Sequence, residues 1–269
     1  MTRQDPAGSP KDKKEKTAVP AVEKALDVLE LLARSPDGLT MNEIVDALGR
    51  TMGEIYRVVV YLAERNYLQQ SPDTSRYALT LKLFELSHTH DPTERLIRAA
   101  LPMLERIAAS TRQSCHIGVL NRTNVLVLAS VQSPLPAGYS VRTGALFPVD
   151  QTSSGHVILA FSPSEVQQRY VTRRPQADQA ALHARLERIR LNGFEDTPST
   201  MIHGVRNLCV PVFDTRGVAA AITSGFIAQN DAPATADETL AIIRMTALDL
   251  SRTLGFRADT SPFEAALSH

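Results

Sequence analysis

Residues 40–62 constrain the fold most, because they combine two helix starts within one short stretch. Thr40 is followed three residues later by Glu43, and Thr51 is followed three residues later by Glu54. Each pair fits a capping box, in which a hydroxyl and a carboxylate satisfy free amides of a first helical turn. The stretch is therefore predicted to form two short helices joined by a tight turn, with Gly49 ending the first of them.

The second predicted helix has two different faces. One is apolar at helical spacing and carries Ile55, Val58, Val59 and Leu62. The opposite face presents Gly53, Tyr56 and Arg57, with Arg50 just ahead of the helix. This layout is typical of a helix-turn-helix, whose second helix enters the major groove of DNA.

The residues after this helix support the interpretation. Residues 66–70 and 76–79 are short strand-like runs around the turn at 71–75, so they predict a hairpin. A hairpin beside a helix-turn-helix is a wing. Thr74, Ser75 and Arg76 would then meet phosphates, together with Arg50 and Thr51, while Gly53, Tyr56 and Arg57 would meet bases or phosphates.

The charge of this module leaves an alternative open. From Val19 to Ser87 the chain has seven Lys or Arg and ten Asp or Glu, a net charge of −3. DNA-binding modules are usually basic. A metabolite-sensing protein whose N-terminal module docks a protein partner is therefore the alternative to a DNA-binding regulator.

Size and composition bound the remaining classes. The chain of 269 residues is long enough for about two domains, and it has no apolar run of the ~20 residues that a membrane helix needs. Two cysteines are too few for a disulfide framework, so a cytoplasmic protein is expected. No Gly-x-Ser-x-Gly elbow or phosphate-binding glycine loop occurs, so neither an enzyme nor a cofactor is expected.

The second half of the chain changes to a strand pattern. Strands are predicted at 115–120, 125–131, 139–143, 208–213 and 218–223, and helices at 153–161, 164–171, 176–192 and 235–254. Hairpin turns at 121–124 and 214–217 join neighbouring strands. An antiparallel sheet with helices packed on it is an α+β fold.

The expected domains follow from these patterns. They are a disordered arm at 1–18, a winged helix-turn-helix at 19–88, a linker helix at 89–111, a sheet domain at 112–259 and a tail at 260–269. The linker helix has a broad apolar surface that needs a partner, either the next domain or a second subunit. Pro102 is expected to kink or divide it.

With both halves described, the chain resembles the IclR family of transcriptional regulators from about Ala21 to Phe256. The matching segments in the first half are AVEKALDVLELLA, GLTMNEIVDALG, YRVVVYLAERNYL and RYALTLKLFEL. In the second half they are GALFPVDQTSSGHVILAF, HGVRNLCVPVFDTRG and SRTLGF. Where the family commonly has Ser-Thr at the recognition helix and Gly-Lys at the effector helix, this chain has Gly53-Glu54 and Gly155-His156.

The resemblance implies a function and a ligand site. It implies operator DNA as a partner, a C-terminal GAF-like domain that binds a small-molecule effector, and a homodimer or dimer of dimers. The implied pocket lies between the sheet and the helix that starts near Ser153, where free amides favour an anion or a carbonyl oxygen. Its expected residues are Leu135, Leu146, Ser153, Ser154, Gly155, His156, Thr197, Val205, Asn207 and Thr223, a mixture that suits a small organic or aromatic acid.

Four of the singled-out residues have an alternative interpretation. Thr152 is expected to cap the helix instead of contacting a ligand. His156 could contact a ligand or bond locally within the protein. His88 and His90 form a fragment of a metal site without further ligands at suitable spacing, so no metal is expected.

Overall fold

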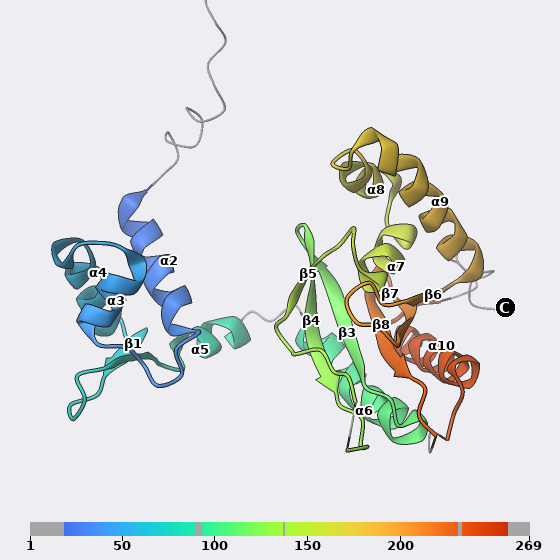
Figure 1. Ribbon diagram of the computed structural model, residues 1–269, viewed down its shortest axis with the longest axis horizontal. Coiled ribbons are helices and arrows are strands. Elements are labelled where there is room, and N and C mark those ends of the chain that lie inside the picture. The colour runs from blue at the N-terminus through green and yellow to red at the C-terminus, as the bar shows by residue number, and fades with distance from the viewer. Residues whose placement is uncertain (1–18, 90–92, 137, 231–232, 258–269) are drawn as a thin grey trace, which may run out of the picture. The chain divides into compact units, whose positions relative to one another are not determined.

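The computed structural model describes residues 19–89, 93–136, 138–230 and 233–257. The predicted arm at 1–18 and tail at 260–269 lie outside these residues, as do His90 and the side chain of His88. The chain divides into two compact units, Met1–Asp91 and Pro92–His269, and each is described by itself (Figure 1). Among the described residues, no helix is long and apolar enough to cross a membrane.

The N-terminal unit contains four helices and a hairpin within its described residues. They are α2 (Pro20–Leu32), α3 (Met41–Leu48), α4 (Met52–Glu64), β1 (Leu68–Gln70), β2 (Tyr77–Leu79) and α5 (Lys82–Thr89). Both predicted capping boxes are present: Glu43 Oε2 accepts from the Thr40 amide at 2.8 Å, and Glu54 Oε2 from the Thr51 amide at 3.0 Å. Gly49 ends α3 in the left-handed conformation at φ 59°. The predicted helix-turn-helix is confirmed.

The wing and the helices share one small core. β1 and β2 pair antiparallel, with Leu68 opposite Leu79. The side chains buried between α2, α3, α4 and the hairpin are Val28, Leu32, Ile44, Ile55, Val59, Leu62, Leu68 and Tyr77. Because α4 contributes Ile55, Val59 and Leu62, its apolar face points inward and the opposite face points to solvent.

The C-terminal unit is built on one antiparallel sheet of six strands, in the order β5-β4-β3-β8-β7-β6. The strands are β3 (Cys115–Asn121), β4 (Asn124–Val131), β5 (Leu146–Pro148), β6 (Glu195–Pro198), β7 (Val205–Asp214) and β8 (Gly217–Ile227). The helices are α6 (Glu94–Thr111), α7 (Ser153–Phe161), α8 (Ser164–Val171), α9 (Gln176–Asn192) and α10 (Ala236–Thr253). This is the α+β fold expected from the sequence.

Helices cover both faces of the sheet (Figure 1). On one face, α6 and α10 place Leu104, Ile107 and Ile243 against Ile117 and Ile222. On the other, α7, α8 and α9 pack over Cys209, Phe213 and Ala221. Most of the apolar surface of α6 is therefore covered within its own unit, by the sheet and α10, while Leu101 is 39% exposed.

The structure corrects three details of the sequence prediction. Residues 139–143 are not a strand; the strand beside β4 is β5, which begins three residues later, at Leu146. The short edge strand β6 was not predicted, because Glu195-Asp196-Thr197-Pro198 has no apolar alternation. Pro102 does not divide α6, which continues through it to Thr111.

Both cysteines are free and buried, as expected for small hydrophobic residues. Burial raises the pKa of the Cys115 thiol to about 12, and burial also raises the pKa of the Cys209 thiol. Neither thiol is a reactive thiolate at neutral pH.

Candidate functional site

The exposed face of α4 is open to a large partner. Tyr56 is 54% exposed and Arg57 is exposed one residue later. A Cβ atom built on Gly53 would have no atom within 4 Å, so the start of the helix also leaves free space.

Two of the predicted phosphate anchors are held inside the unit. Arg50 Nη2 lies 3.8 Å from Glu23 Oε1 and 3.7 Å from Asp27 Oδ2. Arg76 donates to the Gly38 carbonyl at 2.8 Å and to Glu43 Oε1 at 3.0 Å. Their charges are already balanced by neighbouring carboxylates, which sequence spacing alone did not show.

Arg57 is different from the other cations. Lys24, Arg34 and Lys82 also form ion pairs, and Arg65 bonds to the Tyr61 hydroxyl at 3.1 Å. Within the described part of the N-terminal unit, Arg57 is the one cationic side chain without such a partner. An uncompensated guanidinium on an exposed helix face is suited to phosphate or to guanine.

The remaining predicted contacts lie at the ends of α4 and the wing. Thr51 Oγ1 donates to Glu54 at 2.9 Å within the capping box, so this hydroxyl already has a partner. Thr74 and Ser75 are exposed in the turn between β1 and β2. Ser75 has a positive φ of 55°, and its carbonyl accepts from Gln70 Nε2 at 3.3 Å, which fixes the shape of the turn.

A second site lies at the N-terminus of α7, in a hollow that we call the front cavity. Thr152 caps the helix, as expected, and accepts from the Gly155 amide at 3.3 Å, but it also lines the cavity. Ser153 and Ser154 follow in the first turn, and both line the cavity. The free amides of this turn and the two hydroxyls are donors for an anion or a carbonyl oxygen.

The sheet forms the floor of the front cavity. His116 on β3 lies opposite Thr223 on β8, and Asn207 on β7 lies opposite Gly225 on β8. Burial lowers the pKa of His116 from 6.5 to about 4, so its imidazole is neutral at pH 7 and offers one donor and one acceptor. Thr223 Oγ1 donates to Cys209 Sγ at 3.0 Å, and this bond fixes the orientation of the Thr223 hydroxyl.

The walls of the front cavity are partly aromatic. Tyr139 packs over the sheet, and a Cβ atom on Gly225 would come within 2.6 Å of its ring. A side chain at Gly225 would therefore displace Tyr139. The other walls are Val141, Phe147, Ser199 and Met201. The lining residues include no Lys, Arg, Asp or Glu, and the cavity volume is about 40 Å³.

Four of the ten expected ligand residues line this cavity: Ser153, Ser154, Asn207 and Thr223. Sequence reasoning missed His116, Tyr139, Val141, Phe147, Ser199, Met201 and Gly225. A signal for His116 existed, because a polar residue inside an apolar strand run marks a position that faces something other than core. Tyr139 and Val141 lie in the segment wrongly predicted as a strand, which hid their role.

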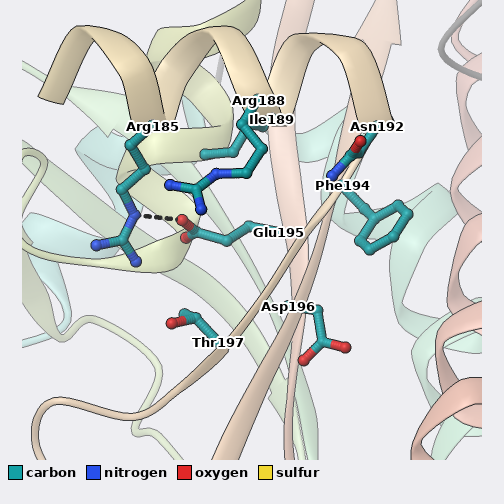
Figure 2. A pocket seen from close by; sticks show the side chains of 8 residues that line it. All are labelled: Arg185, Arg188, Ile189, Asn192, Phe194, Glu195, Asp196 and Thr197. Carbon is teal, nitrogen blue, oxygen red and sulfur yellow. Dashed lines mark hydrogen bonds and ion pairs between the residues drawn. The ribbon is translucent and has the colours of Figure 1, made fainter. Parts of the chain in front are cut away.

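The other six expected residues are not among those that line the front cavity. Leu146 is 54% exposed, and Leu135 is partly buried outside the lining. Gly155 allows the backbone at Val149, not a ligand, to approach α7 closely: a Cβ atom at Gly155 would lie 1.8 Å from the Val149 carbonyl oxygen. Val205 lies on β7 beside Gly225, where its Cγ1 would be 3.4 Å from a Cβ atom built on that glycine. Thr197 lines a different hollow, beside α9 (Figure 2).

His156 bonds locally, on the far side of α7. Its Nε2 donates to the Asp150 carbonyl at 3.1 Å, and its Nδ1 lies 3.6 Å from Glu195 Oε2. Arg185 on α9 donates to the other oxygen of Glu195 at 2.5 Å (Figure 2). Burial raises the pKa of Glu195, but the bonds and charges of His156 and Arg185 outweigh it, so the pKa is lowered and the carboxylate stays ionised.

The described residues contain no group of three or more His, Cys, Asp or Glu that could hold a metal ion. Among the same residues, the front cavity brings together hydroxyls, an amide and a neutral imidazole, with no nucleophile activated by a base. The arrangement is one for binding.

Comparison with known families covers both units. Residues 21–72 match the model of the IclR helix-turn-helix domain, and residues 92–252 match the model of the bacterial transcriptional regulator IclR C-terminal domain. The glycerol operon regulatory protein of Streptomyces griseus is 29% identical over 248 residues, covering 88% of this chain and 97% of that protein. The transcriptional regulator KdgR of Escherichia coli K12 is 24% identical over 252 residues, covering 90% and 95%.

Solved structures show the same fold. An IclR homolog complexed with 4-hydroxybenzoate, from Microbacterium hydrocarbonoxydans, superimposes with a TM-score of 0.75 at 23% identity, covering 87% of this chain and 98% of that one. The IclR protein of Thermotoga maritima gives a TM-score of 0.69 at 22% identity, with 87% and 98% covered. The relatives are named transcriptional regulators and not enzymes, and they give no support to the alternative of a module that docks protein.

Proposed function

Because the chain belongs to the IclR family of bacterial transcriptional regulators, we propose that it reads operator DNA with the exposed face of α4 and responds to a small organic or aromatic acid in the front cavity. We assign residues 19–88 to the DNA-binding domain, 89–111 to the linker helix and 112–259 to the effector-binding domain. The working form is a homodimer or a dimer of dimers.

Arg57 carries the proposal for the DNA side. It is exposed on α4 and has no partner within the described residues of its unit, whereas Arg50 and Arg76 are paired. Arg57 donates two bonds to guanine, with Gly53 and Tyr56 beside it in the groove. Thr74 and Ser75 contact phosphate from the wing, and Arg50 and Arg76 join them only by exchanging carboxylates for phosphate.

The front cavity carries the proposal for the effector. It contains no lysine or arginine, so an acid is held by the first-turn amides of α7 and by Ser153 and Ser154. The rings of Tyr139 and Phe147 provide flat apolar walls for an aromatic body. At about 40 Å³ the cavity holds little more than water, so Tyr139 or Met201 moves when the ligand enters.

The proposed switch connects the two functions through the linker helix. α6 packs on the opposite face of the sheet from α7, through Leu104 and Ile107. A ligand in the front cavity, at the start of α7, changes the packing of α6. This change alters the spacing between the α4 helices of the two subunits of the dimer. That spacing must match half-sites about one DNA turn apart. Scattering profiles that stay identical with and without saturating ligand would contradict this coupling.

The experiment is a thermal-shift screen against small carboxylates and aromatic acids, with 4-hydroxybenzoate among them. A ligand that binds only the folded state raises its stability by about 2.7 kcal/mol at a hundredfold excess over its dissociation constant. A hit that a Ser154 variant abolishes supports the front cavity. A hit that survives every substitution in the front cavity contradicts it.

A further inference from the structure

The first turn of α7 and the loop after β6 together form a wall with two faces. Ser153 and Ser154 face the front cavity, while His156 lines a second hollow on the other side of the helix. In the loop, Ser199 and Met201 face the front cavity, and Thr200 between them lines the second hollow. Adjacent residues therefore serve two separate spaces.

We call this second hollow the back cavity. It lies between α7, the 150–151 loop and α9, and its volume of about 590 Å³ is much larger than that of the front cavity. Its lining residues are Asp150, Gln151, His156, Arg174, Asp178, Ala181, Leu182, Arg185 and Thr200. A space of this size is in the range of small-molecule sites.

Arg185 provides a cationic end for a ligand. Its Nε is bound to Glu195, and in Figure 2 its two terminal nitrogens point away from that carboxylate. Among the described residues these terminal nitrogens have no bonding partner. The free end of a guanidinium matches the two oxygens of a carboxylate.

His156 forms a fixed part of the wall of the back cavity. Its side chain is only 5% exposed, its Nε2 donates to the Asp150 carbonyl at 3.1 Å, and its Nδ1 faces Glu195 Oε2 at 3.6 Å. Both ring nitrogens are therefore directed at the protein, so Arg185 is left to bind the ligand's charge.

The other lining groups favour a ligand with several hydrogen-bond donors. Asp178 is exposed on α9, two turns before Arg185, and within the described residues its carboxylate has no bonded partner. Gln151 and Thr200 add acceptors and donors. Leu182 is buried and supplies a small apolar wall.

We propose that the back cavity is a second ligand site, which takes a small carboxylate rich in hydroxyl groups, and that it acts on the front cavity through their shared wall. The carboxylate binds the free end of Arg185, and the hydroxyls bind Asp178, Gln151 and Thr200. The ligand site itself is independent of DNA binding. Its effect on the front cavity rests on the proposed function.

The experiment is calorimetric titration of the full chain with gluconate, and with hexanoate as a carboxylate of equal chain length that lacks hydroxyls. We expect saturable binding of gluconate and none of hexanoate. Arg185→Gln should weaken gluconate binding by about tenfold or more, the scale of one charge-assisted bond. Asp178→Asn tests the same site without touching the buried Glu195 network.

Arg188→Gln is the matched control. Arg188 lies one turn after Arg185 on α9 and lines the neighbouring hollow, not the back cavity (Figure 2). It should leave gluconate binding within about twofold, as exposed substitutions do. Equal losses of gluconate affinity in Arg185→Gln and Arg188→Gln would overturn the proposal. Gluconate binding that is unchanged in both Asp178→Asn and Arg185→Gln would overturn it as well.

A variant of the front cavity separates the two sites. Asn207→Leu fills its floor and should leave gluconate binding intact. Loss of gluconate binding in that variant would place the ligand in the front cavity and overturn the inference. Absence of gluconate binding to the wild type would overturn it too, while leaving the proposed function standing, because operator binding is measured separately.

Discussion

Nη2 of Arg50 lies 3.7 Å from Oδ2 of Asp27, so a predicted phosphate anchor is held by the helix that braces the helix-turn-helix. Glu23, one turn earlier on α2, lies 3.8 Å from the same nitrogen. If Arg50 is a phosphate anchor, as proposed, DNA competes with α2 for its guanidinium. The net charge of −3 over Val19–Ser87 acts partly through such pairs, and not only as a diffuse repulsion.

Releasing Arg50 should strengthen DNA binding. Asp27→Asn removes its nearest carboxylate, and we expect operator affinity to rise by up to about 1 kcal/mol, the scale of an exposed ion pair. Asp37→Asn is the control, because it changes the net charge by the same amount but breaks no ion pair of a described cation. Fluorescence anisotropy at fixed salt should show a larger gain for Asp27→Asn, and equal gains would attribute the effect to net charge alone.

Gly53→Ala should separate helix stability from DNA binding. Since a Cβ atom there meets nothing within 4 Å, alanine is accommodated and should stabilise α4 by about 0.5–1 kcal/mol. The added methyl group lies on the groove face, so operator affinity should fall. Urea unfolding and anisotropy measured on the same variant test both signs, and a variant that binds DNA more tightly would remove Gly53 from the interface.

Ser154→Ala should weaken binding of the effector to the front cavity. Ser154 is buried at the front cavity, and loss of one hydroxyl bond costs about 0.5–1.5 kcal/mol of affinity. The control is Ser162→Ala, at the other end of α7, where the hydroxyl donates to the Ile158 carbonyl at 2.7 Å. Thermal shifts with the best acid of the screen should fall in the first variant and persist in the second.

The N-terminal unit should lose stability in acid through Glu54. The Lys24 ammonium at 2.9 Å and the Thr51 amide lower the pKa of Glu54 from 4.5 to about 2. A lowered pKa means that the carboxylate stabilises the fold fully above pH 4.5, and that this contribution is lost as the pH falls through 2.

Comparison with Glu54→Gln tests this window. The wild type should be more stable than the variant above pH 4.5, and the difference should shrink steadily toward pH 2. Urea unfolding followed by NMR signals of α4 gives the measurement. Glu64→Gln, on the same helix, is the control, and a difference that stays constant with pH would contradict the role of the Glu54 charge.

Local signals made the helices predictable. Thr40 with Glu43, and Thr51 with Glu54, specify helix starts through bonds within four residues, so they are visible in the sequence. The approximate bounds predicted for α8 and α9 also agree with the structure, and Gly193, which was expected to end the second of these helices, is its C-cap. Boundaries set by such local chemistry do not depend on the rest of the fold.

The front cavity was harder to predict because the pairing register of the strands decides which residues line it. His116 becomes a lining residue through its position opposite Thr223, and Tyr139 through the space above Gly225. Neither relationship is visible in the spacing along the chain. The pairing of Arg76 with Glu43, 33 residues apart, was hidden for the same reason.

The most direct test of the central claim is an operator titration with Arg57→Ala, beside Arg34→Ala as a control of equal charge, two residues after the end of α2. We expect Arg57→Ala to weaken specific binding by about 1–3 kcal/mol and Arg34→Ala to leave it nearly unchanged. For the wild type, affinity should fall with salt by about 0.9 log units per log unit for each neutralised phosphate. A folded Arg57→Ala variant with wild-type affinity would contradict the account.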